Sequence, residues 1–96
     1  MVLLELGISN DTVDMINALY DEQVLTDLES NFEIVKENIE YLKSIGINNI
    51  DELITTDLTA FFPFPSVVKR KVEKVGIDKF KSLLEEDPNN IDILTT

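Results

Sequence analysis

Three short junctions with one shared pattern constrain the fold of this chain more than any other feature of its sequence. Each runs through an apolar residue, glycine, isoleucine and a polar residue that can cap a helix: Leu6-Gly7-Ile8-Ser9, Ile45-Gly46-Ile47-Asn48 and Val75-Gly76-Ile77-Asp78. Glycine accepts the left-handed backbone that ends many helices, and the apolar residue after it packs on the last helical turn. Because Ser, Asn and Asp cap a following helix, each junction predicts a tight corner between two helices.

The second and third junctions belong to a longer repeat with an offset of 30 residues. Asp57 corresponds to Asp87, and every apolar position compared stays apolar. These positions pair Leu42 with Val72, Ile45 with Val75, Ile50 with Phe80, Leu53 with Leu83 and Ile54 with Leu84. The first junction aligns more loosely. Since periods of about 20 to 50 residues are typical of stacked helical units, this offset predicts a two-helix unit that occurs twice.

Apolar residues at helical spacing predict helices over 11–21, 32–45, 66–75 and 78–86, a short helix after Asn49 and a final turn near 90–94. Ser30 and Asn49, each with a glutamate three residues later, and Ser66 are predicted as caps. We therefore predict one all-α domain over residues 1–96, either a small bundle or a short stack of helix-turn-helix repeats with Gly-Ile corners. The predicted core comprises Phe32, Val35, Ile39, Leu42, Ile45, Leu53, Ile54, Val72, Phe80, Leu83 and Leu84.

The chain contains no cysteine, histidine or tryptophan. Without cysteine there is no disulfide, thiol nucleophile or thiolate ligand, and without histidine the commonest general base near neutral pH is missing. No serine lies in a nucleophile-elbow pattern, and there is no glycine-rich phosphate loop. We therefore expect a non-enzymatic protein without catalytic residues, cofactor or metal site, in which acidic clusters such as Asp51-Glu52 serve helix starts.

No stretch approaches the roughly 18 consecutive apolar residues that a membrane-spanning helix requires. Residues 1–6 also lack the basic start and the long apolar run of a secretory signal. We therefore expect a cytoplasmic protein with no membrane partner. Its richness in Ile, Asn, Lys, Asp and Glu is typical of a gene of low GC content, which fits a bacterial or phage source.

The net charge of −11 is unevenly distributed along the chain. Residues 69–81 carry six basic residues against two acidic ones, whereas the segments on either side are acidic. The basic residues are Lys69, Arg70, Lys71, Lys74, Lys79 and Lys81. They are candidate contacts to phosphate groups or to an acidic partner, and the alternative is a solvated helix face.

An aromatic segment, Phe61-Phe62-Pro63-Phe64-Pro65, precedes this basic region. Proline prevents the segment from continuing a helix, and a loop is normally polar. Phe61, Phe62 and Phe64 therefore either fill the space between the repeats or form an exposed patch for a partner.

Residues 32–57 and 68–88 resemble the helical repeats of the mitochondrial transcription termination factor family. In that family a helix ends in Leu-Gly-Ile or a similar sequence, a second helix follows, and a proline usually comes about a dozen residues after the glycine. Pro88 holds that place after Gly76, whereas Leu58 occupies it after Gly46. The resemblance implies a curved stack of helices that binds nucleic acid through a basic concave face.

Residues 38–53 are also similar to helix-hairpin-helix modules, including the C-terminal domain of the bacterial RNA polymerase alpha subunit. Those modules approach the DNA backbone with a glycine in a second hairpin. The equivalent loop here, Phe64-Pro65-Ser66, departs from that requirement.

Three functions are open at this point. The first is a protein–protein interaction module that binds a basic partner through its acidic surface or an apolar one through its phenylalanines. The second is a nucleic-acid-binding helical-repeat or helix-hairpin-helix module that uses the basic residues as phosphate contacts. The third is an acidic nucleic-acid mimic that inhibits a basic protein by occupying its binding cleft.

Overall fold

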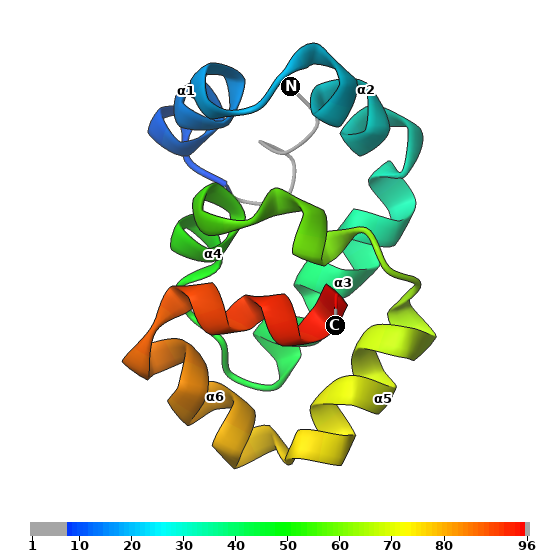
Figure 1. Cartoon of the computed structure of the whole chain (residues 1–96), viewed down its shortest axis with the longest axis vertical. Coiled ribbons are helices and arrows are strands. Elements are labelled where there is room, and N and C mark those ends of the chain that lie inside the picture. Colours follow the sequence, from blue (N-terminus) through cyan, green and yellow to red (C-terminus); the bar gives the residue numbers. More distant parts are fainter. Residues whose placement is uncertain (1–7, 96) are drawn as a thin grey trace.

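The computed structural model describes residues 8–95, and every regular element in that range is a helix (Figure 1). The α-helices are α1 (Asn10–Leu19), α2 (Glu22–Ser30), α3 (Phe32–Ser44), α4 (Ile50–Thr56), α5 (Pro65–Val75) and α6 (Ile77–Glu86). Two 3-10 helices, η2 (Leu58–Phe61) and η3 (Pro88–Thr95), follow α4 and α6. The all-α prediction is confirmed. The Leu6-Gly7 part of the first junction lies outside the described residues.

The corner at Gly46 ends α3 and turns the chain toward α4. Gly46 has a φ of +96°, a value that side chains disfavour. Its N–H donates to the Lys43 carbonyl and the Ile47 N–H donates to the Leu42 carbonyl, both at 3.0 Å. This pair of hydrogen bonds is the Schellman arrangement, which satisfies carbonyls that the helix end would otherwise leave unpaired.

Gly76 alone joins α5 to α6. Its φ is +99° and its ψ is +131°. The Gly76 N–H donates to the Val72 carbonyl at 2.9 Å, and the Gly76 carbonyl accepts from the Phe80 N–H at 2.8 Å. One residue thus ends one helix and begins the next, with a backbone that glycine adopts far more easily than other residues. The corners predicted at Gly46 and Gly76 are both present.

The offset of 30 residues is also a structural repeat. Asp57 and Asp87 directly follow α4 and α6, and their N–H groups donate to the Leu53 and Leu83 carbonyls at 2.9 and 3.0 Å. A 3-10 helix follows each aspartate. Each unit therefore consists of a helix, a glycine corner, a second helix, an aspartate and a 3-10 helix. The units pack on each other, α3 against α5 and both α4 and η2 against η3 (Figure 1).

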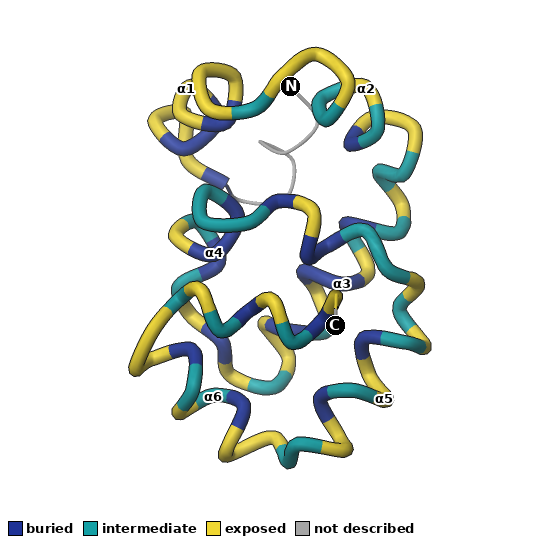
Figure 2. The backbone as a smooth tube through the Cα atoms, in the orientation of Figure 1, coloured by how far each residue is buried: buried dark blue, intermediate teal, exposed yellow. Residues whose placement is uncertain are grey.

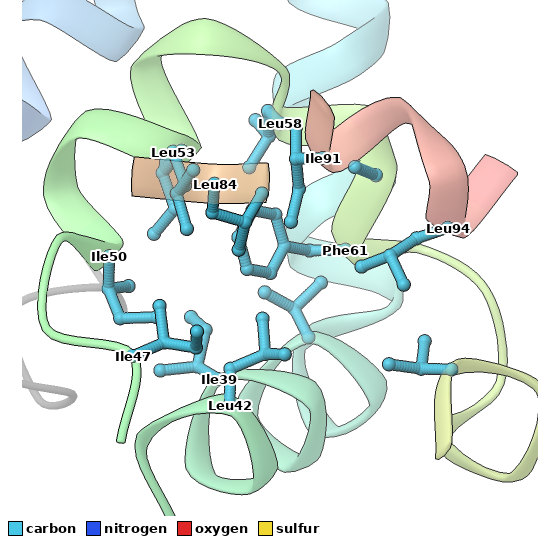
Figure 3. Close-up of a cluster of buried hydrophobic side chains, with 14 of the residues drawn as sticks. Ile39, Leu42, Ile47, Ile50, Leu53, Leu58, Phe61, Leu84, Ile91 and Leu94 are labelled. Carbon is cyan, nitrogen blue, oxygen red and sulfur yellow. The ribbon is translucent and has the colours of Figure 1, made fainter. Parts of the chain in front are cut away.

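Most of the core lies where these two units meet, and α1 and α2 add Val13, Ile16 and Leu28 to it. Every helix of the tube in Figure 2 has at least one buried position. Most predicted core residues are fully buried: Val35, Ile39, Leu42, Leu53, Ile54, Val72, Phe80 and Leu84. Phe32, Ile45 and Leu83 are only half-buried, which corrects the prediction for these three. The 3-10 helices add Leu58, Phe61, Ile91 and Leu94, whose side chains join the same cluster (Figure 3).

Several helix starts differ from the prediction. Ser30 is the last residue of α2, and neither Asn31 before α3 nor Asn49 before α4 makes a side-chain cap. α5 begins at Pro65, so Ser66 lies inside its first turn. Proline suits the first helical position because no N–H partner is needed there, which explains a start one residue earlier than the predicted serine cap.

The polar residues of the three junctions also differ in role. The Ser9 hydroxyl accepts from the Thr12 N–H at 3.2 Å and caps α1 as predicted. Asn48 lies one residue before the cap position of α4, and Asp78 lies inside the first turn of α6. α2 was not predicted, although Val24, Leu25 and Leu28 share one face at helical spacing and the Asp21 side chain caps its start.

Candidate functional site

The three phenylalanines of the aromatic segment do not form one patch. Phe61 is completely buried at the end of η2 and belongs to the core (Figure 3). Phe62 is half-buried, and Phe64 exposes 66% of its surface. Phe61 therefore fills the space between the units, as one interpretation of the segment predicted, whereas Phe64 faces solvent without the other two rings.

Asn38 of α3 fixes the backbone of this segment. Its side chain is fully buried, and the Nδ2 amide donates to the carbonyls of Phe61 and Pro63, both at 2.8 Å. Because both partners are acceptors, the amide nitrogen rather than the oxygen must face them. The Asn38 Oδ1 atom has no hydrogen-bond partner, a cost that the two donated bonds offset. The loop that carries Phe64 is therefore held against α3.

Phe64 is also anchored on its other side. It occupies the cap position of α5, and its carbonyl accepts hydrogen bonds from the N–H groups of Val67 at 2.9 Å and Val68 at 3.1 Å. Pro65 fixes the next backbone angle. The exposed ring is thus presented by a backbone held at both ends. Exposing a phenylalanine forgoes about 1.5–3 kcal/mol of burial free energy, so the position is unfavourable for folding alone.

The six basic residues also separate in space. Lys69 extends over the ring of Tyr41 on α3, with Nζ 5.6 Å from the ring centroid, which is cation–π range. Arg70 is exposed on α5. Lys81 of α6 lies against the corner at Gly46, where an added Cβ would be 2.7 Å from Nζ. The predicted patch is therefore divided, with Lys69 and Lys81 turned to other contacts, although Arg70 lies one helical turn from Lys74.

Lys71, Lys74 and Lys79 do come together, along a groove of about 450 Å³. Val75 and Ile93 supply its apolar lining. The Lys71 Nζ donates to the Leu94 carbonyl at 3.1 Å, which ties α5 to η3 beside the groove.

Tyr41 and Asp51 have perturbed pKa values with structural causes. Burial raises the pKa of the Tyr41 hydroxyl, and the carboxylate of Glu73 raises it further. Burial also acts to raise the pKa of Asp51, but hydrogen bonds from Ser9 and Thr12 and the charge of Lys43 outweigh it, so this pKa is lowered. Asp51 joins α4 to the start of α1, and its shift follows from a structural contact.

Residues 8–95 include no helix that is both long and apolar enough to cross a bilayer. In the same range, no three His, Cys, Asp or Glu side chains are grouped so that they could hold a metal ion. No family model, curated protein or solved structure matches this chain. Its function is therefore inferred from its own geometry.

The sequence contained a signal for Asn38 that the prediction did not use. Asn38 stands three residues after Val35 and four before Leu42, on the apolar face of α3. An amide in that position must find partners inside the protein, because a buried polar group without one is costly. Which carbonyls it contacts depends on the path of the aromatic segment, and the helical period does not reveal that path.

Proposed function

We propose that this chain is a non-enzymatic protein–protein interaction module and that Phe64 is its anchor. The observation that supports this proposal is a large aromatic side chain, 66% exposed, on a loop that Asn38 and the first turn of α5 hold in place. Aromatic residues are enriched among the few side chains that carry most of the binding energy of an interface. An anchor that is already ordered loses little conformational entropy on binding.

The partner's chemistry follows from this side chain and from the net charge. A solvent-facing phenyl ring fits an apolar pocket, and a chain of net charge −11 favours a pocket with a basic rim. Opposite charges around an apolar centre mainly accelerate association and select the partner. The acidic surface and Phe64 therefore serve the same interaction.

The test compares the full chain with two variants as baits for nuclease-treated lysate of the source cells. Phe64→Ser removes the proposed anchor, and Leu19→Ser is the matched control because Leu19 is also an exposed apolar residue, at 60%. We expect a protein that is retained by the wild type and by Leu19→Ser and lost from Phe64→Ser. The purified partner should then bind Phe64→Ser at least about tenfold more weakly in calorimetry.

Two results would count against this proposal. Equal retention by Phe64→Ser and the wild type would show that the exposed ring is not the anchor. If that complex also weakens steeply with salt, the acidic mimic becomes the better explanation. Nucleic acid that the chain retains from untreated lysate, and no longer retains after nuclease treatment, would instead favour the nucleic-acid-binding alternative.

The nucleic-acid-binding alternative receives less support from the geometry. Its phosphate contacts would be the basic residues, and these lie apart around Tyr41, Gly46 and the lysine groove. Affinity for nucleic acid grows with the number of phosphates neutralised, and the overall negative charge opposes every such contact.

A further inference from the structure

The groove between α5, α6 and η3 is a second surface, distinct from Phe64. Lys71 and Lys74 of α5 and Lys79 of α6 stand along it, and Val75 and Ile93 line it. In Figure 1, α5 and α6 form the lower end of the molecule, and η3, in orange to red, runs across above them. Phe64 precedes the first turn of α5, whereas Lys74 lies in its last turn, about 15 Å further along the helix axis.

We propose that this groove binds an acidic peptide segment of a partner. An apolar side chain of the peptide packs on Val75 and Ile93, and flanking carboxylates pair with Lys71, Lys74 and Lys79. The ligand proposed for the groove is acidic, whereas the partner proposed for Phe64 has a basic rim, so the two surfaces would bind different ligands.

The positions of the three amines support this assignment. Lys74 and Lys79 are exposed, and the hydrogen bond of Lys71 to the Leu94 carbonyl holds its amine at the η3 side. The chain has eight basic residues in all, and three of them surround this one groove. Clustered positive charge beside low-dielectric walls concentrates an anionic ligand there.

The apolar lining argues for a peptide rather than a nucleic acid. Val75 and Ile93 are half-buried. An aliphatic side chain that packs on them gains binding free energy from the buried apolar area, whereas a phosphate group does not. Three lysines would neutralise only a few phosphates, and the remaining phosphates would face a surface of the same sign. A short peptide places its charges within the groove and extends little beyond it.

The structure offers a matched control on the same helix. Lys69 and Arg70 belong to α5 but do not line the groove, and Lys69 extends toward Tyr41 on α3. The double variants Lys74→Glu/Lys79→Glu and Lys69→Glu/Arg70→Glu change the net charge equally. A difference in peptide affinity between the two variants is therefore due to the groove lysines and not to the net charge of the protein.

The experiment measures fluorescence anisotropy of a labelled peptide, acetyl-Asp-Glu-Leu-Leu-Asp-Glu-amide, titrated with the full chain. We expect Lys74→Glu/Lys79→Glu to weaken binding at least about tenfold and Lys69→Glu/Arg70→Glu to change it by less than about threefold. Peptides with serine for leucine, or with amides for the carboxylates, should also bind more weakly. Lys74→Ala/Lys79→Ala repeats the comparison without introducing carboxylates, and circular dichroism checks that every variant is folded.

Three outcomes would overturn the proposal. The wild type would fail to bind the peptide, the two glutamate variants would weaken binding equally, or a single-stranded oligonucleotide of equal charge would bind more tightly with the same dependence on Lys74 and Lys79. None of these outcomes bears on Phe64, because Phe64→Ser retains the groove and should bind the acidic peptide like the wild type.

Discussion

The hydroxyl of Tyr20 accepts a hydrogen bond of 2.8 Å from the backbone N–H of Leu58. It also donates to the carbonyl of Ile54 at 2.9 Å. In an uninterrupted helix this N–H and this carbonyl, four residues apart, would bond to each other. The tyrosine therefore takes the place of a helical hydrogen bond where α4 gives way to η2, and it ties the end of α1 to that point.

We predict that Tyr20→Phe lowers the free energy of unfolding by about 1 kcal/mol, because a buried N–H and a carbonyl lose their shared partner. Burial raises the pKa of Tyr20 above its ordinary value, the Leu58 N–H opposes this, and the charge of Asp57 adds to it. The hydroxyl thus keeps its proton at neutral pH and can donate. Urea denaturation measures the change.

The control for this prediction is Tyr41→Phe, at the other tyrosine of the chain, whose ring packs beneath Lys69. We expect its unfolding midpoint to stay close to that of the wild type. If the unfolding midpoint fell equally in both variants, the hydrogen bonds of the Tyr20 hydroxyl would make no specific contribution to stability.

Local patterns predicted the parts of this fold that local residues determine. Gly46 and Gly76 were recognisable because a helix end with a positive φ requires glycine, and the matched apolar positions at an offset of 30 residues follow from helical spacing. The caps at Ser30 and Ser66 were predicted wrongly, because proline and an adjoining helix moved the starts of α3 and α5.

The parts that depend on chain path were not predictable in this way. Phe61 and Phe64 have the same side chain and lie three residues apart, yet one is buried and the other is exposed. Their difference depends on where Asn38 holds the segment between them. The lysine groove likewise exists only because η3 returns beside α5, which brings Ile93 close to Lys71 and Lys74.

The buried contacts of Asn38 predict which of two substitutions at this position destabilises the protein more. Asn38→Leu removes the donors from two carbonyls and should cost about 1–3 kcal/mol of stability. Asn38→Asp should cost more, about 3 kcal/mol or more, because it buries a carboxylate against the same carbonyl oxygens. Urea denaturation at neutral pH measures both.

Asn38→Asp should lose more stability than Asn38→Leu at neutral pH, and this extra loss should become smaller in acid. A protonated carboxyl donates one hydrogen bond and carries no charge. The contact with Phe61 and Pro63 would have no energetic importance if both variants were as stable as the wild type. A reversed order at neutral pH would mean that the site admits water.

The two glycine corners provide an internally controlled prediction. Gly46→Ala and Gly76→Ala should each cost about 1 kcal/mol, because both impose a positive φ on a residue with a side chain. A Cβ at Gly46 would also meet the Lys81 Nζ at 2.7 Å, whereas a Cβ at Gly76 meets no atom within 4 Å. Displacing Lys81 removes a cation from the C-terminal end of α3, where the helix dipole favours it.

We therefore expect Lys81→Met to reduce the cost of Gly46→Ala and to leave that of Gly76→Ala unchanged. A double-mutant cycle at each glycine, followed by thermal denaturation, measures the two couplings. Equal couplings at both corners would show that Lys81 acts through the net charge and not through its position over Gly46.

The last prediction concerns acid and the contact between α1 and α4. The Asp51 Oδ2 atom accepts from the Ser9 N–H at 3.2 Å and from the Thr12 hydroxyl at 2.9 Å. Burial acts to raise the pKa of this carboxyl, but these hydrogen bonds and Lys43 bring it below the ordinary value of 3.8. A carboxyl with a lowered pKa stabilises the folded state fully above its unfolded pKa and loses that contribution as the pH falls through its folded pKa.

Asp51→Asn should therefore lower the free energy of unfolding at neutral pH. The difference in this free energy between the variant and the wild type should become smaller as the pH falls below about 4. Urea unfolding across a pH series measures it, with Asp14→Asn on the exposed side of α1 as the control. A difference that stayed constant down to about pH 2 would mean that the charge of Asp51 contributes nothing and that its shape alone joins the helices. A difference that grew in acid would require the opposite pKa shift, and the hydrogen bonds from Ser9 and Thr12 would then not favour the ionised carboxyl.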